Sequence, residues 1–398
     1  MVTIRDLCIS IGSGSTPSRK RPEFFVGDIP WLKTKELADA TVFDTEEKIS
    51  TDALEKSSCK LLPVGAVVMA MYGATVGKLG ILGRKMATNQ ACCAMVTNPE
   101  LLDSRYLFYW LKRNRREIQD LSTGAAQQNL SVRTIGAIEI EPPPVGMQIR
   151  ISRVLGSLDD KIAANNRVIA VIDETILALW RASVSSKAAF VRLDDVVELN
   201  PRTSVPKGTV VRTIEMKHLP ESGFSVKEWV AREAKGGSRF RNGDTLLARI
   251  TPCFENGKCG YVDFLGAEGI GAGSTEFIVM RPQPGVPPAA PYSIARSTDF
   301  RTFAEQTMTG TSGRQRVQHG DLGTYETAWP DEDSLTTFGS ATSPLLELAE
   351  KLRDENSSLA KTRDELLPLL MNGKITVREA KQEAAAAGAE ILGKENEA

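Results

Sequence analysis

The sequence predicts an α+β fold with two globular units and two long helices that pack on each other. Three observations support this prediction: the chain is an imperfect tandem repeat, each copy mixes short strands with helices, and each copy ends in a long heptad pattern. At 398 residues the chain is long enough for two or three domains, each with a core of its own.

The two copies open in the same way. VTIRDL at 2–7 returns as VRLDDV at 191–196, and each is followed by a polar stretch that ends in proline. Further along, TGAAQQ at 123–128 matches TSGRQR at 311–316. The repeat indicates one scaffold used twice with different lengths inside each globular unit.

A glycine-rich hairpin also occurs twice. AMYGATVGKLGIL at 70–82 is similar to a nucleotide-binding loop, but three residues rather than four separate its glycines and leucine follows its lysine. Its apolar flanks instead predict a strand, a turn and a strand. GAVVMA at 65–70 corresponds to GDTLLA at 243–248, which makes Lys78 and Lys258 counterparts.

Each copy ends in apolar residues spaced alternately three and four apart, which predicts a helix with a heptad seam. The seam contains Leu155, Leu158, Ile162, Ile169, Ile172 and Ile176 in the first copy, and Leu345, Leu348, Leu352, Leu359 and Leu366 in the second. Asn165, Glu355 and Thr362 are polar members. Two helices that each pack only on their own domain are the alternative, but the matched register favours mutual packing.

The composition argues against several classes of function. The chain has two histidines, no C-x-x-C pair and no apolar run long enough for a bilayer, so we expect no metal site, no hydrolytic triad, no membrane contact and a cytoplasmic location. The net charge is −1, yet residues 201–260 carry 11 basic against 6 acidic side chains and residues 344–398 carry 8 against 11. The basic segment suits DNA, and the acidic one suits a protein partner.

These motifs resemble one family, the specificity (S) subunits of Type I restriction-modification systems, over about residues 1–378. The likeness lies in GSGSTPSRKRPEFFVGDIPWLKTKEL, AMYGATVGKLGIL, ATNQACCAM, TGAAQQNLS and PPPVGMQIRISRVLGSLDDKIAANN, with NPRTSVPKG and GDTLLARITPCFENGKCG as a looser second set. The resemblance implies two target-recognition domains (1–146 and 187–340), two spacer helices (147–186 and 341–380) in an antiparallel coiled coil, and a tail at 381–398.

The resemblance further implies a non-catalytic reader of double-stranded DNA. Methylation (M) subunits, two of them, would methylate adenine and restriction (R) subunits would cleave; these partners would use S-adenosylmethionine, ATP and magnesium, and this chain itself no cofactor. The acidic helices would dock the M subunits. Residues 151–180 would span roughly 45 Å as a helix, close to the roughly 34–36 Å between successive major-groove faces. We therefore expect a bipartite, asymmetric target with an unread spacer.

Polar and basic residues in the loops are the candidate DNA contacts, because Lys and Arg bind phosphates and Arg, Lys, Asn and Gln match base edges. They are Ser15, Thr16, Lys33, Lys35, Tyr72, Lys78, Gln127, Gln128 and Asn129 in the first domain, and Lys217, Arg249, Lys258, Arg314, Gln315 and Arg316 in the second. For each of them a solvated surface side chain is the alternative.

Two other function classes remain open. The chain could be a nucleic-acid enzyme with Asp44, Glu46 and Glu47 as metal ligands, although DTEEK is better explained as an exposed charged turn. It could instead be a coiled-coil adaptor without DNA binding, against which the basic segment weighs.

Overall fold

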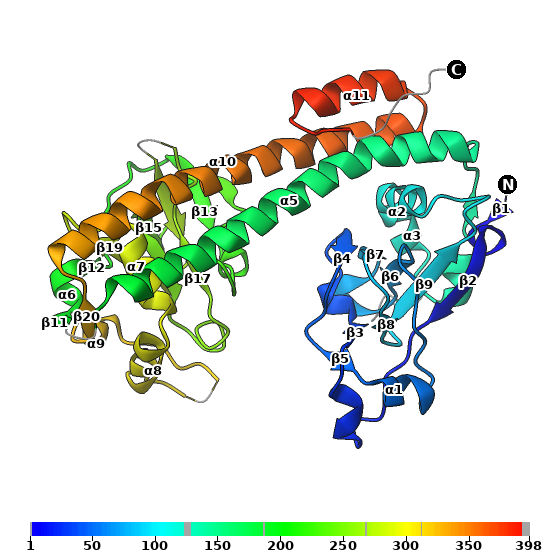
Figure 1. Ribbon diagram of the computed structural model, residues 1–398. Coiled ribbons are helices and arrows are strands. Elements are labelled where there is room, and N and C mark those ends of the chain that lie inside the picture. Colours follow the sequence, from blue (N-terminus) through cyan, green and yellow to red (C-terminus); the bar gives the residue numbers. More distant parts are fainter. Residues whose placement is uncertain (1, 123–128, 186–187, 267–268, 312, 392–398) are drawn as a thin grey trace. The chain divides into compact units, whose positions relative to one another are not determined.

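The computed structural model describes all residues except 1, 123–128, 186–187, 267–268, 312 and 392–398 (Figure 1). The chain forms two compact units, which we call unit 1 (residues 1–162 and 358–398) and unit 2 (residues 163–357). Both mix helices with sheets, which confirms the predicted α+β class. No helix among the described residues is long and apolar enough to cross a bilayer.

Unit 1 is built on a twisted sheet with strand order β2-β9-β6-β7-β4, beside a second sheet of order β5-β3-β8 and a short β1-β10 ladder. Its strands are β1 (Val2–Thr3), β2 (Cys8–Ser13), β3 (Ile29–Leu32), β4 (Ala40–Val42), β5 (Lys48–Ile49), β6 (Val67–Ala70), β7 (Leu79–Leu82), β8 (Ala87–Thr88), β9 (Cys92–Thr97) and β10 (Glu139–Ile140). Its shorter helices are η1 (Ile4–Leu7), η2 (Pro22–Phe25), η3 (Thr34–Glu36), α1 (Thr51–Glu55), η4 (Gly73–Thr75), α2 (Ser104–Arg113), α3 (Arg115–Asp120), α4 (Val132–Gly136) and α11 (Val377–Ala386).

The core of unit 1 lies between this main sheet and α2. Every residue of β6 and β7 is buried, and such unbroken apolar runs are typical of strands covered on both faces. The α2 helix begins where the side chain of Asp103 accepts a hydrogen bond from Tyr106 N, and it then buries Tyr106, Leu107, Phe108 and Tyr109. The chain breaks at Asn114, which separates α2 from α3.

Unit 2 repeats this plan with different strands. One sheet has the order β12-β19-β16-β17 and another β14-β13-β18-β15, and β11 pairs with β20. Its strands are β11 (Ala189–Arg192), β12 (Val197–Leu199), β13 (Val210–Ile214), β14 (Val230–Glu233), β15 (Ser238–Arg241), β16 (Thr245–Ala248), β17 (Cys259–Tyr261), β18 (Ile270–Gly273), β19 (Phe277–Pro282) and β20 (Glu326–Trp329). Its shorter helices are α6 (Leu193–Val196), η5 (Met216–His218), α7 (Ala289–Arg296), α8 (Thr298–Gln306) and α9 (His319–Leu322).

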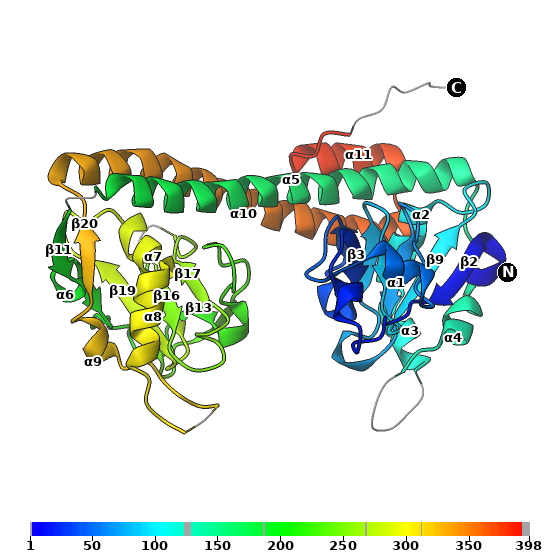
Figure 2. The same ribbon diagram turned by 60° about the horizontal axis from the view of Figure 1, so that its bottom comes forward.

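The α7 helix of unit 2 packs on β16, β17 and β19 (Figure 2), as α2 packs on β6 and β7 in unit 1. All residues from Ala289 to Ala295 are buried, and Phe300 of α8 completes the same core. The hairpin β16–β17 is antiparallel, like β6–β7, which confirms that the glycine-rich stretch is a repeated hairpin rather than a phosphate loop.

Two long helices contribute to both units: α5 (Val145–Ser183) and α10 (Glu332–Met371). In unit 1 the first half of α5 packs with the second half of α10, because Leu155, Leu158 and Leu359 share one core. In unit 2 the second half of α5 shares a core with the first half of α10, through Ile176 and Leu346. The two helices therefore run antiparallel, as predicted, and lie side by side in Figure 1.

The predicted seam residues are buried to different degrees. Leu155, Leu158, Ile169, Ile172, Ile176, Leu359 and Leu366 are buried, Ile162, Leu345 and Leu352 are partly buried, and Leu348 is 42% exposed. In this part of α10 the buried stripe instead runs through Thr342, Leu346, Ala349 and Arg353. The Arg353 side chain forms an ion pair with Asp263 on the loop after β17. This face of α10 therefore packs against the sheets of unit 2.

Asn165 is a buried polar residue of α5 that bonds to α10. Its side-chain amide donates to Glu355 Oε2 at 2.6 Å and to Asn356 Oδ1 at 2.9 Å, both on α10. Only 4% of Asn165 is exposed, so these bonds hold the two helices at one register.

After α10 the chain turns at Gly373, whose φ is +65°, and forms α11. Thr376 caps this helix in a reciprocal pair with Glu379. Ala380 and Ala384 of α11 are buried in the core of unit 1. The α11 helix is thus an integral part of unit 1.

Candidate nucleic-acid interface

The repeated hairpins place Lys78 and Lys258 in matching environments within their own units. Lys78 Nζ lies 3.6 Å from Asp39, and Lys258 Nζ lies 3.7 Å from Glu221. The side chain of Lys78 is 48% exposed. That of Lys258 is only 14% exposed, because its ammonium also donates to the carbonyl oxygens of Met216 and Leu219 at 3.2 and 3.1 Å. Of the two lysines, Lys78 is the one with charge available to a ligand.

An arginine on a neighbouring helix bonds to each hairpin turn. This arginine is Arg115 of α3 in unit 1 and Arg296 of α7 in unit 2. In unit 1 Arg115 Nε donates to Gly77 O at 2.9 Å, and in unit 2 Arg296 Nη1 donates to Gly257 O at 2.9 Å. Both glycines have a positive φ, which the turn requires. These arginines fix the loops that carry the candidate lysines. No motif in the sequence signals this role, because each contact joins residues nearly 40 positions apart.

Ser15 and Thr16 lie on the loop after β2, and the backbone there is tightly held. Ser15 O accepts from Trp31 Nε1 at 3.0 Å, and Ser15 N donates to Thr88 O at 2.9 Å. The Thr16 hydroxyl bonds to the side chain of Gln90. A DNA contact from either hydroxyl would therefore start from a fixed backbone.

Lys33 and Lys35 lie in an ion-pair cluster at η3. Lys33 Nζ contacts Glu46 at 3.2 Å and Glu47 at 2.6 Å, and its side chain is 15% exposed. Lys35 contacts Glu46 at 2.5 Å and is 61% exposed. Lys35 is consequently the more available of the two. The cluster also engages two of the carboxylates that were candidate metal ligands, and the third, Asp44, pairs with Lys48 at 3.2 Å.

Tyr72 and Asn129 come together at the tip of the first hairpin, where they form an isolated antiparallel bridge. Tyr72 is 42% exposed, and Asn129 is also exposed. Gln127 and Gln128 lie outside the described residues. The bridge brings two candidates that are 57 positions apart onto one surface of unit 1.

The counterpart loop of unit 2 is held against the end of its hairpin. Gln315 exchanges hydrogen bonds with Thr251, from Gln315 N to Thr251 Oγ1 at 3.0 Å and from Thr251 N to Gln315 O at 3.0 Å. Arg316 grips Glu276 with both Nε and Nη2, at 2.8–3.0 Å. The bonds from Arg316 hold the pKa of Glu276 below its usual range. Arg316 therefore ties its loop to the turn between β18 and β19.

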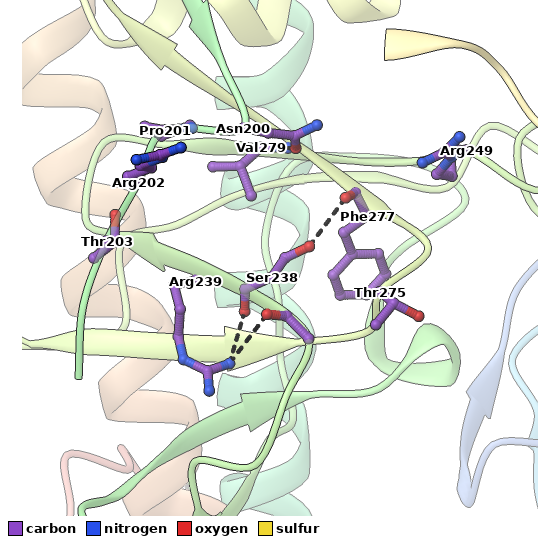
Figure 3. Close-up of a pocket in the computed structure, with 11 residues that line it drawn as sticks. Asn200, Pro201, Arg202, Thr203, Ser238, Arg239, Arg249, Thr275, Phe277 and Val279 are labelled. Carbon is purple, nitrogen blue, oxygen red and sulfur yellow. Dashed lines mark hydrogen bonds between the residues drawn. The ribbon is translucent and has the colours of Figure 1, made fainter. Parts of the chain in front are cut away.

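Arg314, Lys217 and Arg249 differ in their surroundings. Arg314 is exposed, and Lys217 is 71% exposed with Glu215 at 3.1 Å. Arg249 instead lines a cavity of about 400 Å³, and two arginines that belong to no sequence motif, Arg202 and Arg239, line its opposite side (Figure 3). The basic balance of residues 201–260 was the one sequence signal for these two.

The geometry thus gives each unit a loop surface with exposed basic and amide groups. In the described part of the chain, no group of three or more His, Cys, Asp or Glu could hold a metal ion. Which of the candidate residues contact DNA stays a prediction.

Sequence comparisons relate this chain to known proteins. Residues 1–174 match the Type I restriction modification DNA specificity domain. The Type I restriction enzyme MjaIX specificity subunit of Methanocaldococcus jannaschii is 26% identical over 223 residues, which is 55% of this chain and 51% of that protein. The EcoEI specificity subunit of Escherichia coli is 26% identical over 194 residues, or 46% of this chain and 32% of that protein.

A third relative, the EcoAI specificity subunit of Escherichia coli, is 33% identical over 132 residues, or 31% of this chain and 22% of that protein. The matched region spans about half the length of the MjaIX subunit and less of the other two. Among solved structures, the S subunit of a Type I restriction-modification system from M. genitalium has a TM-score of 0.55 at 14% identity, covering 92% of this chain and 94% of that one. It shares the fold.

Proposed function

We propose that this chain is the DNA-reading subunit of a Type I restriction-modification system, because residues 1–174 match the Type I restriction modification DNA specificity domain and the chain is similar to specificity subunits. Each unit reads one part of a bipartite, asymmetric double-stranded target. Methylation subunits, two per chain, methylate adenine there, and restriction subunits cleave. S-adenosylmethionine, ATP and magnesium act in those partners, and this chain is not itself catalytic.

The observation that carries the proposal is the repeated scaffold with different loops. Both units place an arginine-anchored hairpin beside a second loop, Tyr72 with Asn129 in unit 1 and Ile250 with Arg316 in unit 2. The side chains on these loops differ between units, so the two halves of the target should differ as well. Phosphate contacts from Lys and Arg would supply affinity, and base-edge contacts would supply sequence preference.

Methylation mapping tests the proposal directly. The chain is expressed with its M subunit, and N6-methyladenine is mapped over the whole genome against cells that express the M subunit alone. We expect one gapped, asymmetric motif to be methylated only when this chain is present. An identical map in both strains, with both proteins detected as expressed, would contradict the proposal and return the chain to the adaptor class.

Substitutions in the loops of each unit sharpen the test. Replacing the surface residues Lys35, Tyr72 and Asn129 of unit 1 by alanine should change or abolish methylation of one half of the motif. Changing Lys217 and Arg314 in unit 2 should affect the other half. Thermal unfolding of each purified variant shows whether the fold is kept.

A further inference from the structure

The cavity beside β15 and β19 is lined by three arginines. We call it the arginine cavity. It has a volume of about 400 Å³, and its lining contains no carboxylate. The lining residues are Asn200, Pro201, Arg202, Thr203, Gly237, Ser238, Arg239, Arg249, Thr275, Phe277 and Val279. Three guanidinium groups therefore share one hollow without an acidic partner in its wall.

Arg249 is held rigidly at one end of this cavity. Its backbone N donates to Glu276 O at 2.9 Å, and its carbonyl accepts from Val317 N at 2.8 Å. Its side-chain Nε is buried and has no hydrogen-bond partner among the described residues. The nearby carboxylate of Glu276 takes its hydrogen bonds from Arg316, although the charge of Arg249 also helps to lower the pKa of Glu276. A buried donor without an acceptor costs stability, and a ligand oxygen entering the cavity would remove that cost.

Arg202 and Arg239 lie on the other side of the cavity in Figure 3, with Ser238 and Phe277 between them and Arg249. Arg239 donates to the carbonyl oxygens of Gly237 and Ser238 at 3.3 Å each. Those carbonyls orient the guanidinium but leave its charge in place. Arg202 is exposed. The three arginines thus surround the space from two sides.

A second cavity of about 470 Å³ continues the basic surface. It shares Arg202 and Thr203 with the arginine cavity and adds Arg241 and Arg281. Arg281 is paired with the buried Asp244 at 2.7 Å, so it contributes structure rather than free charge. Arg241 is exposed. Arginine side chains therefore line these two cavities from Arg249 past Arg202 to Arg241.

We propose that the arginine cavity binds a phosphate group of the DNA backbone, with Arg249 Nε donating from the inner wall and Arg202 and Arg239 closing over the anion. This inference rests on the proposed function. Three guanidinium groups without a carboxylate match a group that carries a full negative charge and several acceptor oxygens. A base edge offers acceptors but no charge to balance them. The site would position the DNA and add to affinity without reading sequence.

The first test needs no DNA. Inorganic phosphate is titrated into the full-length chain at constant ionic strength, and the Nε–Hε signals of the arginines are followed by NMR. The Arg249 signal is assigned by its loss in Arg249→Lys. We expect it to move with phosphate and to stay still with chloride. Absence of any movement overturns the anion site.

The second test asks whether the anion belongs to DNA. The complex of this chain with its M subunits is bound to target duplexes in which single phosphates are replaced by neutral methylphosphonate. One such position should weaken wild-type binding about ten-fold, as expected for loss of a charge-assisted bond. Arg249→Met should bind the unmodified duplex about ten-fold more weakly, and the same methylphosphonate should then have no further effect.

Arg232→Met is the matched control, because Arg232 is an arginine of unit 2 outside both cavities and pairs with Glu215. It should leave the pattern of sensitive phosphates unchanged. Additive losses at every position in Arg249→Met would overturn the phosphate contact, and so would relaxed methylation at one base pair with an unchanged salt slope. A wild-type complex that binds no DNA would instead refute the proposed function, and the phosphate titration would still decide whether the cavity is an anion site.

Discussion

Lys258 Nζ lies 3.7 Å from a carboxylate oxygen of Glu221. Lys78 and Asp39 form the equivalent pair in unit 1 at 3.6 Å. Each acid lies two residues after a buried leucine, Leu37 or Leu219, that follows a 3₁₀ turn. The repeat therefore preserves an ion pair as well as backbone elements. The two pairs have diverged in burial, which gives the predictions below their contrasts.

Asp39 should stabilise unit 1 in a pH-dependent way. Burial alone would raise the pKa of its carboxyl, but hydrogen bonds from Arg115 and the backbone of Leu79 lower it. A lowered pKa in the folded state gives stability that is present above the unfolded pKa and is lost as pH falls through the folded one. Asp39→Asn should cost about 2 kcal/mol in free energy of unfolding at pH 7.

This difference should shrink as the pH falls below the unfolded pKa of about 4, and urea unfolding from pH 7 to pH 3 measures it. Asparagine suits the test because it tolerates the positive φ of 59° at this position. Glu221→Gln in unit 2 is the control, since Glu221 is 57% exposed and should change stability little. Equal costs at pH 7 and pH 3 would contradict the ion-pair explanation.

The counterpart lysines should behave differently when each is replaced by methionine. Lys258→Met leaves the carbonyls of Met216 and Leu219 without their donor, so it should lower the free energy of unfolding by about 1–2 kcal/mol. Lys78→Met should alter stability by less than about 0.5 kcal/mol, because the side chain is half exposed. In the complex, only Lys78→Met is expected to reduce the salt dependence of DNA binding, by about 0.9 in slope. The reverse ranking would show that Lys258 is the DNA contact.

Asn165 should specify how α5 and α10 pair. Asn165→Leu removes the donor to Glu355 and Asn356 inside the seam, so it should destabilise the chain by about 1–2 kcal/mol. The double variant Asn165→Leu/Glu355→Leu should recover that loss or exceed wild-type stability, at the expense of a fixed register. Thermal unfolding of the four members of the cycle measures the coupling. Additive effects would show that the two side chains do not stabilise each other.

Arg314 and Arg316 are two residues apart and should have separate effects. Arg314 is exposed, so Arg314→Gln should weaken DNA binding by the complex about five-fold with little change in stability. Arg316 is bonded to Glu276 through two nitrogens, so Arg316→Gln should loosen the loop and lower thermal stability. Fluorescence anisotropy with labelled target DNA and a thermal melt separate the two outcomes. A loss of binding without loss of stability in Arg316→Gln would assign it to the DNA.

The sequence predicted the large features because each of them repeats. The antiparallel hairpins, the long helices and buried seam residues such as Leu158 and Ile176 follow from periodicity that occurs twice. The stripe through Leu346, Ala349 and Arg353 was not predictable in this way. A buried arginine interrupts the apolar pattern there, and its partner Asp263 is 90 positions away.

The site was less predictable than the fold, since loop position alone could not separate free charges from paired ones. Lys33 and Lys258 both lie within sequence motifs. In the structure, however, the ammonium of Lys33 pairs with Glu47, and that of Lys258 donates to the carbonyl of Leu219. Arg202 and Arg239 belong to no motif and meet Arg249 only because the strands of unit 2 bring them together. Such groupings form only in the folded unit, because their members are far apart in the sequence.

The division of the chain has a consequence for the order in which the protein folds as it is made. Residues 163–357 form unit 2 as one uninterrupted segment, whereas unit 1 joins residues 1–162 to residues 358–398. During synthesis, all residues of unit 2 are therefore made before Leu359, Leu366 and Ala380, which unit 1 needs to complete its core. A nascent chain halted near residue 357 would carry one finished unit and one with an open apolar face, and it would depend on chaperones or be degraded.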